Sequence, residues 1–396
     1  MKKIFFLTGE VSGDIHAASL LNELYKILPK EQLIVKAVGG IHLKNAGADI
    51  FFNSKHLASM GLTEVINKLP LYINLERELL FYLATFQPNV LVLVDFPGFN
   101  LRITSKIKKF SPKTKVVYYF PPQVWAWNTG RTKILAKHCD LVLCGLPFEE
   151  TFHKKYGVNA SYVGNPILHE LEKFDRDEIR KELNLTKENT LISLFPGSRK
   201  SEIHYMLPVL LEAADMLHKA FANYKFMISQ APTISNLDSE IKAIVEKKNL
   251  SNVIKNITIL PPGQNHKLLC ASDFAWLTSG TVTLEAALYE TPMILGYRGN
   301  QINYFLYLML KKIDMIGLPN IIAEKKIVPE LIQNDATAQN YYQTTKELLK
   351  VHGHLDKVKD SLRAVKEKIT EKDASKEAAL MIKNKFMPDY KVITMK

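Results

Sequence analysis

The sequence predicts an α/β protein with two doubly wound domains, each built on a parallel β-sheet. The chain has 396 residues, which is too long for one ordinary domain. Short apolar runs alternate with helix-length amphipathic segments in two series, and a charged stretch at 172–190 separates them. Strands that alternate with helices favour parallel βαβ units covered on both faces. Because such sheets bind ligands beyond the carboxyl ends of their strands, we expect the site in a cleft between the domains.

The strands are predicted where short apolar runs end at turn residues. In the first series these runs are 4–7, 34–38, 90–94, 115–119, 141–144 and 161–163. In the second series they are 191–195, 226–229, 257–260, 274–277 and 293–295. Helices are predicted between them, for example at 15–28 and 71–86, and only helical, lysine-rich segments follow after about residue 335.

The charge of the chain suggests a negatively charged partner. The 52 basic and 40 acidic residues give a net charge of +12, which suits nucleic acid, a phosphorylated ligand or an anionic membrane. Many bacterial cytosolic proteins are equally basic without a specific reason. The basic residues are spread along the chain and form no recognised nucleic-acid module, which argues against nucleic acid.

The cysteines and the first residues favour a cytoplasmic protein. Cys139, Cys144 and Cys270 have no metal-ligand spacing, so we interpret them as buried thiols in a reducing compartment and predict no metal site. The segment "MKKIFFLTGE" has an apolar core of only 4–7, which indicates a first strand rather than an export signal. No apolar run reaches the roughly 18 residues needed to cross a bilayer.

In the stretch "LVLVDFPGFNLR", residues 91–102, a predicted apolar strand is followed directly by the carboxylate of Asp95. Asp95 is either a turn or capping residue, or a catalytic base at the rim of the sheet.

The first strand is followed by a turn with room for a ligand. Gly9 and Gly13 are four residues apart, which is not a dinucleotide fingerprint, but the small Ser12 and Gly13 leave space. Asp14 is a candidate N-cap. His16, on the first helical turn, is either an acid or base or a hydrogen-bonded surface histidine.

Two turns in the second series predict anion sites. In "LISLFPGSRKSEI" (191–203), a helix begins after Gly197 and Ser198, and Arg199 adds a fork of donors suited to phosphate. The alternative is a common turn with a surface arginine, and no Walker lysine follows. In "WLTSGTVTLE" (276–285), Ser279, Gly280 and Thr281 form a similar polar turn. Glu285 then either accepts hydrogen bonds from a ribose or opposes the helix dipole.

Aromatic and apolar segments suggest a lipid or sugar ligand. In "VVYYFPPQVWAWNTGR" (116–131), Trp125 and Trp127 either stack on a sugar or acyl chain or pack the core. The stretches 69–86 and 303–312 are apolar and are flanked or crossed by basic residues. Each either lies in a membrane surface or forms a buried helix or an oligomer interface.

Together these motifs resemble the lipid-A-disaccharide synthases, glycosyltransferase family 19 of Gram-negative bacteria. The matching segments, in family order, are "GEVSGD" (9–14), "DFPGFN" (95–100), "PPQVWAWNTGR" (121–131), "LPFE" (146–149), "PGSR" (196–199), "SGTVTLE" (279–285) and "GLPN" (317–320). The tryptophan loop together with the Pro-Gly-Ser-Arg turn is quite specific.

The resemblance implies a GT-B fold, two Rossmann-like domains with a cleft between them. It implies an acceptor and membrane domain at 1–168, a UDP-sugar domain at 169–355, and helices at 356–396 that cross back. The expected reaction is inverting: UDP-2,3-diacylglucosamine and 2,3-diacylglucosamine 1-phosphate (lipid X) give the β-1,6-linked lipid A disaccharide 1-phosphate and UDP. The enzyme is expected to need no cofactor or metal, to bind the inner face of the anionic inner membrane peripherally, and to form a homodimer in some members.

The resemblance also implies roles for residues. Asp95 is the expected base for the acceptor hydroxyl, and Arg199 stabilises the departing UDP together with the helix starts at Ser198 and 279–281. Glu285 holds the ribose. The further expected substrate-binding residues are Ser12, Gly13, Asp14, His16, Asn100, Trp125, Gly197, Tyr297 and Asn320.

The chain departs from the family pattern at two positions. Gly98 stands where many members have a second aspartate, so Asp95 is expected to act alone, and Asn165 stands where a histidine is frequent. The alternative enzymes are a UDP-N-acetylglucosamine 2-epimerase and the N-acetylglucosaminyltransferase of peptidoglycan synthesis. The tryptophan loop and apolar stretches argue against the first, and the absence of a glycine-rich first turn argues against the second. A non-catalytic membrane- or nucleic-acid-binding protein is the remaining alternative.

Overall fold

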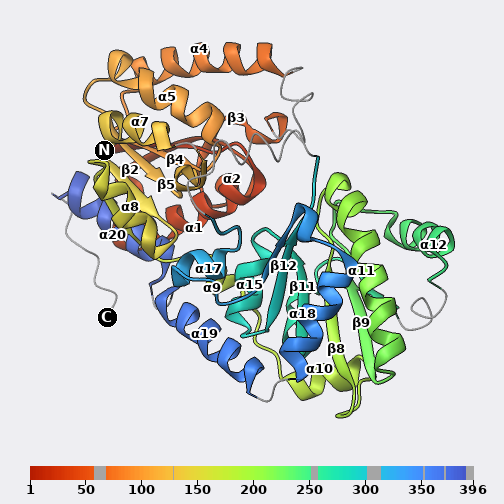
Figure 1. Ribbon diagram of the computed structural model, residues 1–396. Coiled ribbons are helices and arrows are strands. Elements are labelled where there is room, and N and C mark those ends of the chain that lie inside the picture. Colours follow the sequence, from red (N-terminus) through yellow and green to blue (C-terminus); the bar gives the residue numbers. More distant parts are fainter. Residues whose placement is uncertain are drawn as a thin grey trace. The chain divides into compact units, whose positions relative to one another are not determined.

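The chain folds into two compact α/β units in the computed structural model (Figure 1). The structure describes residues 1–57, 68–127, 129–250, 257–300, 314–350, 353–369 and 372–388. The first unit comprises Met1–Pro166 and Ile369–Lys396, and the second comprises Ile167–Lys368. The boundaries therefore fall after residues 166 and 368, whereas the sequence suggested 168 and 355.

The first unit contains a parallel seven-stranded sheet in the order β3-β2-β1-β4-β5-β6-β7. Its strands are β1 (Lys2–Leu7), β2 (Leu33–Gly39), β3 (Asp49–Asn53), β4 (Val90–Val94), β5 (Lys115–Tyr119), β6 (Leu141–Cys144) and β7 (Ala160–Tyr162). The strand order reverses between β1 and β4, which pair from Ile4 opposite Val90 to Leu7 opposite Leu93. Ligands of doubly wound sheets bind at such a reversal, so the turns after β1 and β4 are the expected place.

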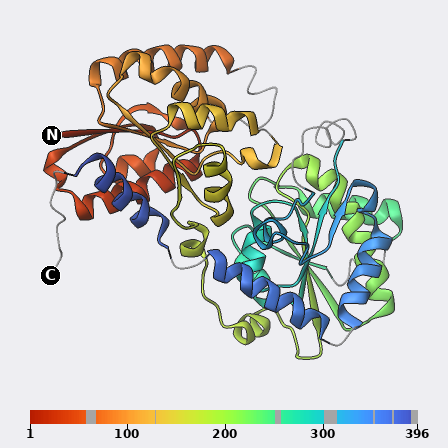
Figure 2. The same cartoon turned by 60° about the vertical axis from the view of Figure 1, so that its left-hand side comes forward.

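Helices cover both faces of this sheet, which explains why its central strand β4 is apolar and buried throughout. The helices are α1 (Val11–Ile27), α2 (Ile41–Asn45), α4 (Leu69–Phe86), α5 (Pro97–Phe110), α6 (Val124–Trp127), α7 (Thr132–His138), α8 (Pro147–Lys155) and α20 (Ala374–Phe386). Ile4 and Phe6 of β1 pack with α1 and α20, whereas Phe5 and Leu7 pack with α4 and α5. Figures 1 and 2 show these two helix layers on opposite sides of the sheet. Successive side chains of a strand point to opposite faces, so both sets must be apolar.

The second unit repeats this plan with a parallel six-stranded sheet in the order β10-β9-β8-β11-β12-β13. Its strands are β8 (Thr190–Phe195), β9 (Tyr224–Ser229), β10 (Ile257–Leu260), β11 (Phe274–Thr278), β12 (Met293–Tyr297) and β13 (Glu330–Ile332). Its helices are α9 (Ile167–Glu170), α10 (Arg176–Glu182), α11 (Lys200–Ala220), α12 (Leu237–Lys248), α14 (Asn265–Ala271), α15 (Val282–Leu288), α17 (Leu318–Ala323), α18 (Ala338–Lys350) and α19 (His354–Ile369). Here the order reverses between β8 and β11.

The predicted strands are all present within a few residues, and two short ones were missed. β3 and β13 are outermost strands with a single partner each, and neither is fully buried. Because an outermost strand needs less apolar surface, its sequence signal is weak. Cys139 and Cys144 are buried as predicted, whereas Cys270 is only partly buried. Within the described residues, no helix combines the length and the apolar character that crossing a membrane requires. The apolar run 303–312 lies outside the described residues.

Candidate active site

The turns after β1 and β4 lie together at the carboxyl edge of the first sheet. Gly9 follows β1, and a Cβ atom added there would lie 2.1 Å from the ring of Phe96, which follows β4. Only glycine therefore lets the Phe96 ring pack against the first turn. The "GEVSGD" and "DFPGFN" motifs, far apart in the sequence, form one structural element.

Asp95 lies in a strained turn. Both Asp95 and Phe96 have φ of 48°, a left-handed conformation that side chains other than glycine rarely adopt. The turn is held because the Asp95 carbonyl accepts hydrogen bonds from Asn100 Nδ2 at 2.7 Å and from the Tyr118 hydroxyl at 2.8 Å. Phe96, not Asp95, is the N-cap of α5, so the capping interpretation of Asp95 is wrong. Strain of this kind is concentrated at functional sites.

A second carboxylate, that of Glu10, lies close enough to Asp95 for the charge of Asp95 to affect the ionisation of Glu10. Burial raises the pKa of Asp95, and a backbone hydrogen bond from Phe96 partly opposes this. Burial also raises the pKa of Glu10, and the negative charge of Asp95 raises it further. Glu10 was not predicted as a site residue, although it belongs to the "GEVSGD" motif. The carboxylate that couples to Asp95 is Glu10 of the β1 turn, whereas the Asp95 loop has Gly98, with open space around its Cα, where many family members have a second aspartate.

His16 and Ser12 lie on α1 beside this turn. The His16 ring meets the edge of Phe120 with centroids 5.2 Å apart, and burial lowers the pKa of His16. The imidazole is therefore held neutral, the form that can accept a proton. Ser12 is exposed, whereas Gly13 is buried. A Cβ atom on Gly13 would lie 3.5 Å from the Val94 carbonyl oxygen, an ordinary contact distance, so the packing of α1 on β4 does not itself require glycine here.

Asp14 has a structural role that differs from the prediction. It lies inside α1, whose N-cap is Glu10, so it does not cap its own helix. Its buried carboxylate instead accepts hydrogen bonds from the backbone N–H groups of Gly40 (2.6 Å) and His42 (2.9 Å), at the start of α2. The carboxylate therefore serves as a cap for a helix 26 residues away in the sequence.

Asn100 and Trp125, both predicted to bind substrate, are buried. Asn100 supports the Asp95 turn, as described above. Trp125 Nε1 donates a hydrogen bond to Glu149 Oε1 at 2.9 Å, and its ring meets Phe148 with centroids 5.0 Å apart. The core-packing interpretation of Trp125 is thus the one that the contacts favour. Asn165 donates a hydrogen bond to the Gly145 carbonyl at 3.0 Å.

The second sheet brings both predicted anion turns to its own reversal point, after β8 and β11. Gly197 has φ of 117°, and a Cβ atom there would lie 2.5 Å from Glu202 Cβ. Glu202 Oε2 accepts from the N–H groups of Ser198 (2.8 Å) and Arg199 (3.2 Å), and Oε1 accepts from the Arg199 guanidinium at 3.2 Å. The backbone donors expected to be free are therefore occupied by the chain's own carboxylate. The Arg199 side chain is 78% exposed.

The turn after β11 is open to solvent at its centre. Gly280 and Thr281 are exposed, and Gly280 has open space around its Cα. Ser279 is less available, because its hydroxyl donates to the Ile316 carbonyl at 2.9 Å.

Glu285 faces two polar residues of α14. Its Oε2 lies 3.5 Å from His266 Nε2 and accepts a 3.4 Å hydrogen bond from Asn265 Nδ2. Neither Asn265 nor His266 was predicted. The polar run "GQNHK" at 263–267 was a usable signal, because it interrupts a largely apolar series between two strands.

Asn320 and Tyr297 differ sharply in accessibility. Asn320 is fully buried, and its side chain donates to the Val328 carbonyl and Glu330 Oε1 while accepting from the N–H groups of Ile327 and Val328. The side chain is engaged in holding the segment before β13, and its expected role in a ligand site stays a prediction. Tyr297, at the end of β12, is 38% exposed.

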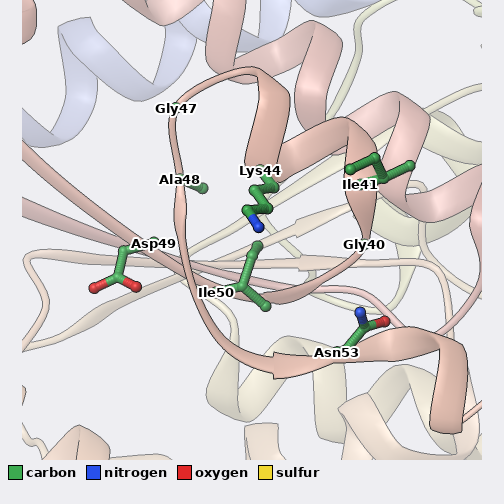
Figure 3. A pocket seen from close by; sticks show the side chains of 8 residues that line it. All are labelled: Gly40, Ile41, Lys44, Gly47, Ala48, Asp49, Ile50 and Asn53. Carbon is green, nitrogen blue, oxygen red and sulfur yellow. The ribbon is translucent and has the colours of Figure 1, made fainter.

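A pocket of about 700 Å³ lies beside α2 and β3, next to the Gly40 N–H group that donates to Asp14 (Figure 3). It is lined by Gly40, Ile41, Lys44, Gly47, Ala48, Asp49, Ile50 and Asn53. Among the described residues, no group of three or more histidine, cysteine, aspartate or glutamate side chains could hold a metal ion.

Comparison with solved structures defines the class of the protein. The UDP-N-acetylglucosamine 2-epimerase of Neisseria meningitidis bound to UDP-GlcNAc matches with a TM-score of 0.60 at 12% identity, over 98% of this chain and 100% of that one. The S. aureus MnaA structure with UDP matches with a TM-score of 0.62 at 12% identity, over 100% and 99% of the two chains. These likenesses establish the GT-B fold that the sequence predicted.

Sequence comparison then identifies the family. The family model described as lipid-A-disaccharide synthetase matches residues 4–384. The lipid-A-disaccharide synthase of Idiomarina loihiensis is 36% identical over 349 residues, covering 88% of this chain and 89% of that protein. The enzyme of Syntrophus aciditrophicus is 34% identical over 384 residues, covering 96% and 97%. The chain belongs to the lipid-A-disaccharide synthase family, glycosyltransferases that form the lipid A disaccharide in lipopolysaccharide biosynthesis. The predicted family and activity are confirmed, and the epimerase alternative shares the fold only.

Proposed function

We propose that this glycosyltransferase uses Asp95 as the base that activates the 6-hydroxyl of lipid X. As Asp95 removes the hydroxyl proton, the oxygen attacks the anomeric carbon of UDP-2,3-diacylglucosamine, and the bond from that carbon to the UDP oxygen breaks. The products are the β-1,6-linked disaccharide 1-phosphate and UDP. The observation that carries this proposal is the strained turn that presents Asp95 at the reversal point of the first sheet.

Burial supports Asp95 in this role. A sugar hydroxyl is a weak acid, and a carboxylate with a raised pKa accepts its proton more readily. Burial raises the pKa of Asp95 in this direction. The hydrogen bonds from Asn100 and Tyr118 fix the turn in advance, so little reorganisation is needed during the reaction.

The carboxylate of Glu10 affects the pKa of Asp95, the proposed base. Two like charges near each other do not ionise equally, and the shared proton stays on the group with the higher pKa. The pKa of Glu10 is raised by burial and by the charge of Asp95. Coupling between two charges is mutual, so an ionised Glu10 in turn disfavours the ionised form of Asp95 and makes Asp95 a stronger base.

The second unit supplies the groups for UDP. The exposed guanidinium of Arg199 and the open turn at Gly280 and Thr281 suit an anionic diphosphate. Glu285 suits the ribose hydroxyls, and Asn265 and His266 orient its carboxylate. The diphosphate competes with Glu202 for Arg199 and for the N–H groups at the start of α11.

A transfer assay with purified protein, UDP-2,3-diacylglucosamine and lipid X tests the assignment of the base. We expect Asp95→Asn to lower kcat by about 10³-fold and His16→Ala to have a smaller effect. Asn22→Ala, on an α1 position away from the Asp95 turn, is the control and should retain the wild-type rate. Wild-type turnover by Asp95→Asn, or a larger loss in His16→Ala, would reject Asp95 as the base.

We further propose that the enzyme binds the anionic inner face of the inner membrane through the outer side of α4. Leu69, Ile73 and Phe81 of this helix are 46%, 51% and 72% exposed. They are spaced by multiples of four residues, with Arg77 between them, so they share one helical face. An apolar stripe with a basic residue suits an anionic lipid surface. The leucines at 79, 80 and 83 belong to the core instead.

Liposome co-sedimentation tests the membrane proposal. Ile73→Ser/Phe81→Ser is expected to weaken binding to vesicles with anionic lipid, because it removes exposed apolar surface. Ile41→Ser, which changes a side chain 59% exposed in the same unit, is the matched control. Equal binding by both variants would exclude α4 as the contact. We also propose a homodimer, which light scattering of the purified protein tests directly.

A further inference from the structure

One buried pair of side chains ties two loops at the carboxyl edge of the first sheet. Trp125 belongs to the tryptophan loop after β5 (residues 121–127), and Glu149 belongs to α8 after β6. The indole Nε1 of Trp125 donates to Glu149 Oε1 at 2.9 Å. Glu149 Oε2 accepts from the N–H group of Leu146 at 3.1 Å. Both oxygens of a carboxylate that is only 4% exposed are therefore engaged.

The Trp125–Glu149 hydrogen bond lies near the first βα turn, where His16 is found. Phe120 is the first residue of the segment that leads into the tryptophan loop and has φ of 57°. Its ring contacts His16, and a Cβ atom added to Gly145 would lie 3.1 Å from it. Phe120 is thus packed between α1 and the start of the segment that carries Glu149. Fixing Trp125 to Glu149 fixes the course of the loop beside α1.

Burying the ionised carboxylate of Glu149 lowers the stability of the folded protein. Burial raises the pKa of Glu149 to about 7, although the hydrogen bonds from Trp125 and from the backbone of Leu146 and Gly145 oppose this rise. Above about pH 7 the protein therefore keeps a buried, ionised carboxylate where an uncharged side chain would avoid the desolvation cost. The charge of Glu149 also acts on Cys144 of β6, whose pKa is raised first by burial and then by Glu149 and Glu150, while Lys154 lowers it.

We propose that Glu149 is a positioning residue of the transferase, whose ionised carboxylate holds Trp125 and so keeps the tryptophan loop in place beside α1. An ionised carboxylate accepts with both oxygens, whereas the protonated acid turns one oxygen into a donor. That oxygen faces an N–H group, so protonation weakens the bond to Trp125 or the bond to Leu146. The effect on catalysis rests on the proposal that the first unit binds the acceptor.

Glu149→Gln tests this inference, because an amide imitates the protonated acid. Glu150→Gln, one residue along the same helix, is the matched control, since it also removes a carboxylate that accepts a backbone hydrogen bond. We expect Glu149→Gln to lower kcat/KM for lipid X about tenfold at pH 8 and to leave the KM for the UDP-sugar unchanged. The loss should shrink toward pH 6, where the wild type is itself protonated, and Glu150→Gln should show no such trend.

A spectroscopic measurement separates this inference from the catalytic proposal. The indole N–H resonance of Trp125, assigned with Trp125→Phe, should titrate with a midpoint near 7 in the wild type and stay constant in Glu149→Gln. A wild-type pH profile for Glu149→Gln, or a loss that only follows the unfolded fraction, would overturn the positioning role. An indole titration with unchanged kinetics would also overturn it, whereas an inactive wild type would reject the transferase proposal instead.

Discussion

The carboxyl edges of the two sheets have the same topology and opposite chemistry. In the first unit, the reversal point presents two carboxylates, Glu10 and Asp95, from a strained and partly buried turn. In the second unit, the reversal point presents a guanidinium, backbone N–H groups and a small polar turn. The fold therefore determines where a ligand group can lie, and the loop residues determine whether that place accepts a proton or binds an anion.

The contrast extends to how each edge is held. The Asp95 turn is fixed by Asn100 and Tyr118, neither of which can carry a negative charge at neutral pH. The Arg199 turn is fixed by Glu202, whose carboxylate binds the same donors that a phosphate would use. The first edge is thus preorganised for its role, whereas the second must exchange an internal partner for its ligand.

Apart from the loss of transfer expected for Asp95→Asn, the largest effect that would sharpen this contrast is on the anion side. Arg199→Ala removes a fork of charge-assisted donors, so we expect kcat/KM for the UDP-sugar to fall by about 10- to 100-fold. The shape of the pH profile should stay unchanged, because the carboxylates of the first unit are untouched. Steady-state kinetics at several pH values measure both. A shifted acid limb in Arg199→Ala would mean that the two edges do not have separate roles.

A smaller effect of opposite sign is expected at Glu202. Glu202→Gln removes the negative charge that competes with the diphosphate, so UDP should bind about fivefold more tightly. Isothermal titration calorimetry measures the change, and Glu212→Gln, farther along α11, is the control. Weaker UDP binding by Glu202→Gln would show that Glu202 serves to orient Arg199 for the ligand.

On the acidic side, Glu10→Gln should change the pH dependence more than the maximal rate. Removing a like charge makes ionisation of Asp95 easier, so its pKa falls. Because catalysis requires ionised Asp95, the acid limb of kcat/KM should move to lower pH. The pH profiles of wild type and variant measure this shift. An acid limb that moves to higher pH would contradict the coupling.

The smallest effect concerns stability. The pKa of Glu149 rises from the ordinary 4.5 to about 7 in the folded protein. The folded state then binds this proton more tightly than the unfolded state does. The free energy of unfolding that this proton contributes is complete below about pH 4.5 and is lost as pH rises to about 7. The Tm of Glu149→Gln relative to wild type should therefore increase by a few degrees from pH 5 to pH 8. Thermal melts across this range measure it, and a constant difference would contradict the raised pKa.

The sequence predicted which turns carry functional groups, because an apolar strand that ends abruptly in a polar turn is a local pattern. Asp95, Arg199 and Gly280 were placed correctly at strand ends for this reason. The sequence could not predict which groups the buried polar side chains contact. Asp14 caps a helix 26 residues away, and Trp125 bonds to a residue 24 positions further on. Glu10 was missed because its proximity to Asp95 depends on β1 lying next to β4.

The central claim is that the first edge performs the proton transfer and the second edge binds the nucleotide. The most direct test is the Kd for UDP of Asp95→Asn, measured on the same preparation whose transfer rate has been determined. We predict a Kd within about twofold of the wild type together with a transfer rate lower by about 10³-fold. A Kd for UDP that rises in parallel with the loss of transfer would contradict the claim.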